Sequence, residues 1–141
     1  MASPKRLTPA EWELMDTIWS LGGAPSVRDV VDTAYPEGEK AYTTVQTIMN
    51  TLVDKGLLRR RKMGLVNFYK PTRRRSTVER AETRSLLSRI FGGSRAALAN
   101  TLLDLEGLDL EELQEIKSKL REKELQLTEE NDRDPEGEEA P

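Results

Sequence analysis

The chain of 141 residues contains no cysteine and no histidine. The absence of cysteine excludes disulfides, thiolate nucleophiles and thiolate metal ligands. The absence of histidine excludes a Ser-His-Asp triad and the histidine-containing zinc sites. No group of acidic residues has the pattern of a buried catalytic site. We therefore expect no enzyme, no bound metal and no cofactor.

Long apolar runs are missing as well. No segment approaches the roughly 20 apolar residues that a helix needs to cross a bilayer. Residues 1–7 carry charges but no apolar stretch of the kind found in secretory signals. We expect a cytoplasmic protein without membrane insertion. Hydrophobic residues make up 36% and charged residues 33% of the chain, which indicates small helical units and a partner chain.

Charge is distributed unevenly along the chain. Residues 1–75 contain 13 Lys and Arg against 8 Asp and Glu, whereas residues 76–141 contain 9 against 17. The basic first part favours an anionic partner, and the acidic second part favours a role in assembly.

Capping boxes mark the starts of two helices. Thr8 followed by Pro9 and Glu11 predicts a first helix that ends at Gly22-Gly23, and Ser26 with Asp29 predicts a second. The apolar residues of both recur at helical spacing. They are Trp12, Met15, Ile18 and Trp19 in the first helix, and Val27, Val30, Val31 and Ala34 in the second.

A third helix is predicted from Tyr42 to Lys55. Its apolar stripe is Val45, Ile48, Met49 and Leu52. The rest of its surface is short, neutral and polar, whereas a solvated helix face usually carries Glu and Lys, which are better helix formers. These polar residues are Thr43, Thr44, Gln46, Thr47, Asn50 and Thr51.

A β-hairpin follows the third helix. Its first strand begins at Leu58, the turn is expected at Met63-Gly64, and the second strand ends before Pro71. Three helices followed by a hairpin predict a winged helix-turn-helix domain over residues 1–75, in which the third helix enters the DNA major groove. The fold class is mainly α with a small β-hairpin wing.

The DNA-binding residues are expected on the third helix and on the wing. Thr, Gln and Asn side chains reach base edges, and Arg and Lys neutralise phosphates. Each feature alone also fits a solvated surface, and the order of the elements favours the DNA-binding interpretation. The candidates are Tyr42, Thr43, Thr44, Gln46, Thr47, Asn50, Arg59, Arg60, Arg61 and Lys62. For residues 73–75, all Arg, contact with DNA and a purely solvated linker remain equal alternatives. The aromatic residues Trp12, Trp19, Phe68 and Tyr69 are interpreted as core.

Residues 76–127 are expected to form a helical dimerisation domain. Ser76 and Glu79 form a capping pair that predicts a helix to about Phe91, followed by a short helix over about residues 95–105 and a last helix from Asp109. A C₂ dimer would bury their apolar faces, and the alternative is a monomer in which they fold back. The candidate contacts are Leu98, Leu102, Leu113, Ile116 and Leu120. Residues 128–141 are predicted to be a disordered acidic tail.

Two sequence blocks carry a family resemblance. Residues 7–15 read Leu-Thr-Pro-Ala-Glu-Trp-Glu-Leu-Met, with Ile18-Trp19 behind them, and residues 41–47 read Ala-Tyr-Thr-Thr-Val-Gln-Thr. With Leu52 and residues 55–57, they resemble the penicillinase repressor family of BlaI, MecI and, more distantly, CopY repressors. The resemblance spans about residues 7–120.

The resemblance implies a homodimer that binds a palindromic DNA operator and blocks transcription, with Tyr42 to Thr47 on the recognition helix. In antibiotic-resistance members, a membrane-bound sensor protease triggers cleavage at an Asn-Phe bond of the dimerisation region. The matching residues here are Asn100 and Thr101, so Thr replaces Phe. CopY-like metal sensing needs a cysteine cluster, which this chain lacks.

The sequence also allows a second function, in which the winged-helix domain binds proteins and not DNA. Such a module should expose apolar anchors on its interaction face. The neutral, Thr-rich third helix and the basic wing favour DNA binding instead.

Overall fold

The structure is a computed structural model that describes residues 6–133. The chain forms two compact units, and the boundary between them falls after Arg89, inside α4. In chain order the elements are α1 (Pro9–Leu21), α2 (Val27–Ala34), α3 (Tyr42–Asp54), β1 (Leu58–Met63), β2 (Val66–Pro71), α4 (Arg75–Phe91), α5 (Arg95–Asp104) and α6 (Leu110–Arg133). The mainly helical fold class with one two-stranded hairpin is confirmed.

The first two helices begin at the predicted capping boxes. The Thr8 hydroxyl accepts a hydrogen bond from the Glu11 amide at 3.2 Å, and Glu11 Oε1 accepts one from the Thr8 amide at 2.8 Å. Ser26 and Asp29 repeat this exchange at the start of α2. Each box satisfies amide groups that a helix start leaves without partners, so the local sequence sets where both helices begin.

The core of the first unit lies between α1, α2, α3 and the base of the hairpin. The apolar stripes predicted for the three helices supply it, which confirms their spacing. Its fully enclosed side chains include Leu14, Met15, Ile18, Val30, Val45, Met49, Leu52 and Tyr69. Trp12 and Trp19 are half-buried against this core, with ring centroids 5.9 Å apart. The interpretation of Tyr69 as a core residue is confirmed, whereas Phe68 is only half-buried.

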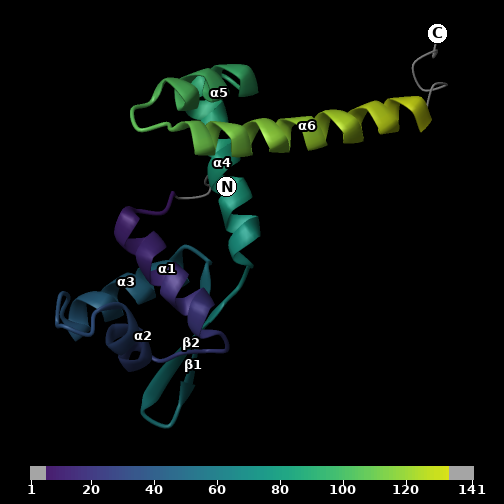
Figure 1. The fold of residues 1–141 in the computed structure, drawn as a ribbon. Helices are drawn as coiled ribbons and strands as arrows, with labels where there is room; N and C mark the ends of the chain where they lie inside the picture. The colour runs from purple at the N-terminus through teal and green to yellow at the C-terminus, as the bar shows by residue number, and fades with distance from the viewer. Residues whose placement is uncertain (1–5, 134–141) are drawn as a thin grey trace. The chain divides into compact units, whose positions relative to one another are not determined.

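The hairpin projects from the helical cluster, as Figure 1 shows. Its strands are antiparallel, with Arg60 opposite Tyr69. The turn consists of Gly64 and Leu65, one residue later than predicted, and Gly64 adopts a positive φ of 65° that favours glycine. The Tyr69 amide also donates to the Pro25 carbonyl at 2.9 Å, so the segment before α2 pairs with the free edge of β2.

The predicted start of α4 needs a correction. The helix begins at Arg75, and the amides of Thr77 and Val78 donate to the Arg74 carbonyl, so Ser76 lies inside the first turn and does not cap it. Tertiary contacts set this start, because Arg75 Nε donates to Asp16 Oδ1 of α1 at 2.8 Å. Arg75 is thus paired with Asp16 within the first unit, and the two alternatives for residues 73–75, contact with DNA and a solvated linker, stay predictions.

In the second unit, α5 and α6 begin at side-chain caps. The Ser94 hydroxyl accepts from the Ala97 amide, and Asp109 Oδ1 accepts from the Glu112 amide at 2.8 Å. The helix α6 continues to Arg133, so the prediction of disorder from Thr128 onward is wrong for residues 128–133. Glutamate is a good helix former, and the breakers Pro135 and Gly137 come only later. Residues 134–141 lie outside the described part.

Within residues 6–133, no helix combines the length and the apolar character needed to cross a membrane.

Candidate nucleic-acid interface

One face of α3 is free of core contacts. The stripe of Val45, Met49 and Leu52 is fully buried. The rest of the helix surface presents its six DNA-binding candidates, four of them exposed and two half-buried. The exposed ones are Tyr42, Thr43, Thr44 and Thr47, and the half-buried ones are Gln46 and Asn50. Residues 42–50 of α3 include no acidic side chain, so none there would repel a phosphate backbone, and the exposed Asp54 follows only at the C-terminal end of the helix.

The hydroxyl groups on this face are not equivalent. The Thr47 hydroxyl donates to the Thr43 carbonyl at 2.9 Å, one helical turn back. Its proton is therefore committed to the helix backbone, and its methyl group and oxygen lone pairs remain for a ligand. The Thr44 side chain is exposed, near the start of the helix, where base contacts are made by recognition helices.

Two basic residues beside the start of α3 were missed by the sequence analysis. The Arg28 guanidinium of α2 lies 4.9 Å from the centre of the Tyr42 ring, and Lys40 Nζ lies 5.5 Å from the centre of the Tyr35 ring. Both contacts are cation–π interactions, which fix the charges beside the polar face. A helical period in residues 27–34 places Arg28 outside the core stripe, but it does not show which neighbour Arg28 meets.

The basic run of the hairpin divides between two faces. Side chains alternate along a strand, so Arg60 and Lys62 share one face while Arg59 and Arg61 share the other. Arg60 lies opposite the buried Tyr69, and its face is therefore the one that meets α3. Arg59 and Arg61 lie opposite Lys70 and Phe68. The four cations, predicted as one group, thus form two pairs with different surroundings.

Asn50 joins α3 to the hairpin. Its Oδ1 accepts hydrogen bonds from the Tyr69 hydroxyl at 2.8 Å and from Arg60 Nη1 at 2.9 Å. Burial raises the pKa of Tyr69, and the positive charge and hydrogen bond of Arg60 offset only part of this effect. Tyr69 therefore stays a neutral hydroxyl donor at ordinary pH.

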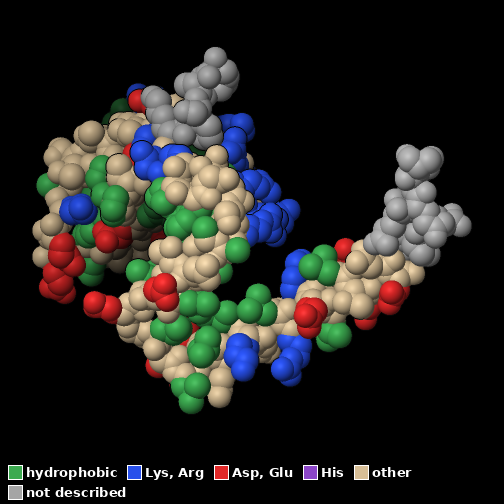
Figure 2. Space-filling model, turned by 90° about the horizontal axis from the view of Figure 1, so that it is seen from above, with side chains coloured by type: hydrophobic (Ala, Val, Ile, Leu, Met, Phe, Trp, Pro, Cys, Tyr) green, Lys and Arg blue, Asp and Glu red, His purple; other side chains and the backbone are tan. Residues whose placement is uncertain are grey.

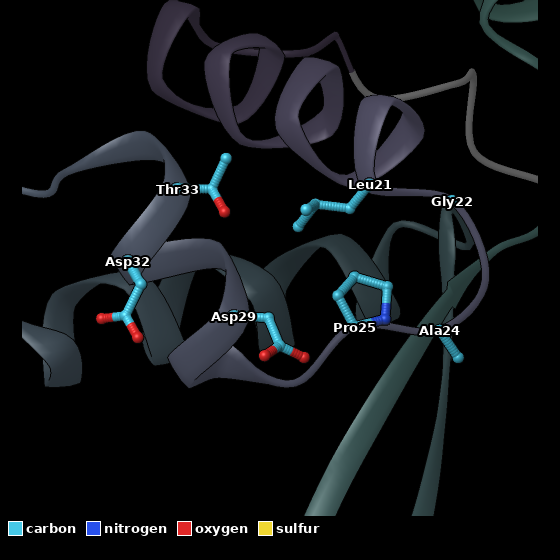
Figure 3. Close-up of a pocket in the computed structure, with 7 residues that line it drawn as sticks. All are labelled: Leu21, Gly22, Ala24, Pro25, Asp29, Asp32 and Thr33. Atoms are coloured by element: carbon cyan, nitrogen blue, oxygen red, sulfur yellow. The ribbon is translucent and has the colours of Figure 1, made fainter.

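A hollow elsewhere in the first unit is a weaker candidate for a functional site. A hollow of about 340 Å³ between the end of α1 and α2 contains two carboxylates, Asp29 and Asp32 (Figure 3). Asp29 is occupied by the capping box, and Asp32 pairs with Arg28 at 3.8 Å. In the part of the chain that the structure describes, no three acidic side chains come together as a metal site would require.

Apolar side chains remain at the surface of the second unit. Leu102 is 54% exposed and Leu120 is 64% exposed, while Leu98, Leu113 and Ile116 are half-buried. The space-filling view shows hydrophobic side chains on the surface among charged ones (Figure 2). On α6, Leu113, Ile116 and Leu120 follow the alternating spacing of three and four of a helix-pairing seam.

The predicted cleavage position lies in the middle of α5. Asn100 and Thr101 are both exposed, and both belong to the helix Arg95–Asp104. A protease binds its substrate in an extended form, so cleavage there would first require this helix to unwind.

Comparisons with known proteins relate this chain to a family of repressors. The family model described as "Penicillinase repressor" matches residues 7–122. An uncharacterized 16.5 kDa protein of Latilactobacillus sakei is 31% identical over 113 residues, which cover 78% of this chain and 77% of that protein. The methicillin resistance regulatory protein MecI of Staphylococcus aureus is 22% identical, covering 83% of this chain and 94% of that protein.

Two further similarities come from Bacillus licheniformis. Its penicillinase repressor is 26% identical over 79% of this chain and 86% of its own length. The solution structure of its BlaI monomeric form in complex with the blaP half-operator is similar to 54% of this chain and 92% of that chain, at 28% identity and a TM-score of 0.44. Because the family model spans most of the sequence, the chain belongs to the penicillinase repressor family.

Proposed function

We propose that this protein is a transcriptional repressor that binds a palindromic DNA operator as a homodimer. The observation that carries the proposal is the neutral polar face over residues 42–50 of α3 beside the basic hairpin, in a chain of the penicillinase repressor family. Relatives named as a penicillinase repressor and a methicillin resistance regulatory protein support a regulatory role.

In this proposal, α3 enters the major groove and the hairpin contacts the backbone. Thr43, Thr44, Gln46 and Thr47 face base edges, because short polar side chains can approach them without steric conflict. The wing residues 59–62 neutralise phosphates, and Arg28 adds a charge at the start of α3. Residues 1–75 are the proposed DNA-binding domain.

Residues 76–127 are the proposed dimerisation domain. The exposed Leu102 and Leu120 and the half-buried Ile116 would lose contact with water when two copies pair. A C₂ pair presents the same patch from each copy, and its two recognition helices face half-sites about 34 Å apart or a multiple of that distance.

A sensor protease remains a proposed partner. The exposed Asn100 and Thr101 are reachable from solvent, and local unwinding of α5 would expose the bond between them. Cleavage at this position would separate the dimerisation region and lower operator affinity, because each half-site would then be bound alone.

A selection from a random duplex library, followed by a salt titration on the enriched sequence, tests the proposal. The expected result is an inverted repeat whose affinity falls steeply with salt. Recovery of no enriched motif, with binding that does not depend on salt, would contradict it and favour a protein-interaction module.

A further inference from the structure

The node formed by Asn50, Arg60 and Tyr69 ties the recognition helix to the wing. Its three residues come from α3, β1 and β2. Tyr69 is completely buried, so its hydroxyl is held in place by the core. Asn50 is half-buried, and Arg60 is exposed. The node thus runs from the interior of the first unit to its surface.

The carboxamide oxygen of Asn50 is saturated. Arg60 has no acceptor atom, so the Asn50 atom that faces it has to be the oxygen. A carbonyl oxygen has two lone pairs, and the donors on Arg60 and Tyr69, at 2.9 and 2.8 Å, take both of them. An asparagine that reads adenine uses this same oxygen to accept from the N6 amino group. Asn50 cannot make that contact while the node is intact.

We propose that Asn50 is a positioning residue of the DNA-binding surface, which fixes the Arg60 guanidinium against α3 and reads no base. This inference rests on the proposed function and refines the role expected for Asn50. A guanidinium has five N–H donors in a planar fork, and the bond to Asn50 leaves others free for phosphate oxygens. Holding the fork before DNA arrives reduces the conformational entropy lost on binding.

Arg60 differs from its neighbours in the basic run by its hydrogen bond to α3. Arg59 and Arg61 lie on the other face of the hairpin, opposite Lys70 and Phe68, and have no such link to α3. Arg60 would therefore contact the backbone at a position set by the recognition helix, and its contribution to binding would depend on Asn50.

A double-mutant cycle on the full chain tests this dependence. Asn50→Ala, Arg60→Ala and the double variant are compared for affinity to the selected duplex, at several salt concentrations. We expect each single variant to lose about tenfold in affinity, and the double variant to lose little more than either, because the two residues act as one unit. Asn50→Ala alone should lower the salt slope by about one, as loss of a phosphate contact does.

Two variants serve as controls. Tyr69→Phe removes one donor to Asn50 but keeps the bond from Arg60, so the salt slope should stay unchanged. Gln46→Ala lies on the same helix, and among the hydrogen bonds of the described residues none involves its side chain. Its effect should add to that of Arg60→Ala and should change the preferred base at one operator position. Thermal unfolding of each variant establishes that all are folded at the assay temperature.

Failure of this inference and failure of the proposed function would give different results. Additive losses in the cycle, together with a changed base preference at one position for Asn50→Ala, would make Asn50 a base reader and overturn the inference. A wild-type protein that enriches no duplex would overturn the proposed function as well. A non-additive cycle with unchanged base preference supports the positioning role.

Discussion

Lys55, the residue directly after α3, donates from Nζ to Oε1 of Glu11 on α1 at 2.6 Å. The side chains are only 13% and 6% exposed, so this ion pair is nearly buried. Lys55 also donates to the Arg6 carbonyl at 2.9 Å. The pair ties the end of α3 to the start of α1 and thereby helps to fix the orientation of α3 in the first unit.

Removing one partner of this pair should destabilise the fold. Lys55→Met leaves the Glu11 carboxylate enclosed without its charge partner, and we expect the free energy of unfolding to fall by about 3 kcal/mol. The double variant Glu11→Gln/Lys55→Met should recover part of this loss, because no buried charge remains. Urea unfolding at neutral pH measures both. Equal stability of Lys55→Met and wild type would show that the pair contributes no net stability.

The same pair predicts a dependence of stability on acid. Burial by itself raises the pKa of Glu11, but the hydrogen bond and charge of Lys55 and the Thr8 amide outweigh it, and the pKa lies below its usual range. A carboxyl whose pKa is lower in the folded state stabilises the fold above its unfolded pKa, about 4.3. This contribution is lost as the pH falls through the lower, folded pKa.

Urea unfolding of wild type and Glu11→Gln across this acid range measures the effect. The difference in unfolding free energy between them should be constant at neutral pH and shrink as the pH falls below about 4.3. If the difference in unfolding free energy grew as the pH fell, folding would raise the pKa of Glu11 and not lower it.

Thr44 should act in sequence reading. Thr44→Ala should weaken binding to the selected duplex by about tenfold and leave binding to unrelated duplex nearly unchanged, because a base contact contributes only at the right sequence. The matched control is Thr51→Ala on the same helix, whose hydroxyl donates to the Thr47 carbonyl at 3.0 Å. Equal losses on both duplexes would remove Thr44 from the reading role.

The apolar seam of α6 predicts the oligomeric state. Ile116→Glu places a charge in the proposed contact and should shift the protein from dimer to monomer in sedimentation, while affinity for a single half-site persists. Ser118→Glu adds the same charge at an exposed residue outside the seam and should leave the dimer intact. A dimer that persists in Ile116→Glu would place the contact elsewhere.

The sequence could predict those elements whose signals are local. The boxes at Thr8–Glu11 and Ser26–Asp29 predicted both helix starts, because each needs only residues three apart. The start of α4 could not be predicted in this way, since Arg75 is held by Asp16 from a distant helix. The end of α6 was missed because the acidic composition of the tail outweighed the helix propensity of Glu129 and Glu130 in the prediction.

The sequence predicted which residues belong to the candidate site but not how they contact one another. Periodicity separated the polar face of α3 from its core stripe, whereas the four cations of the hairpin were predicted as one group. Which face meets α3 depends on the burial of Tyr69, and the bond from Arg60 to Asn50 depends on how a helix and a strand approach each other. Side-chain partners of this kind follow from packing and not from spacing.

The side chains of residues 59–62 alternate between the two faces of the hairpin, so the four residues differ in how well they tolerate substitution. In the proposed function, Arg59 and Arg61, on the face away from α3, contribute only general attraction to a polyanion, and we expect both to tolerate exchange for other residues. The Arg60 guanidinium is hydrogen-bonded to Asn50, so its replacement also removes a bond between the hairpin and α3. In the proposed function, general attraction to DNA can therefore be adjusted at Arg59 and Arg61 without disturbing the contact between the hairpin and α3.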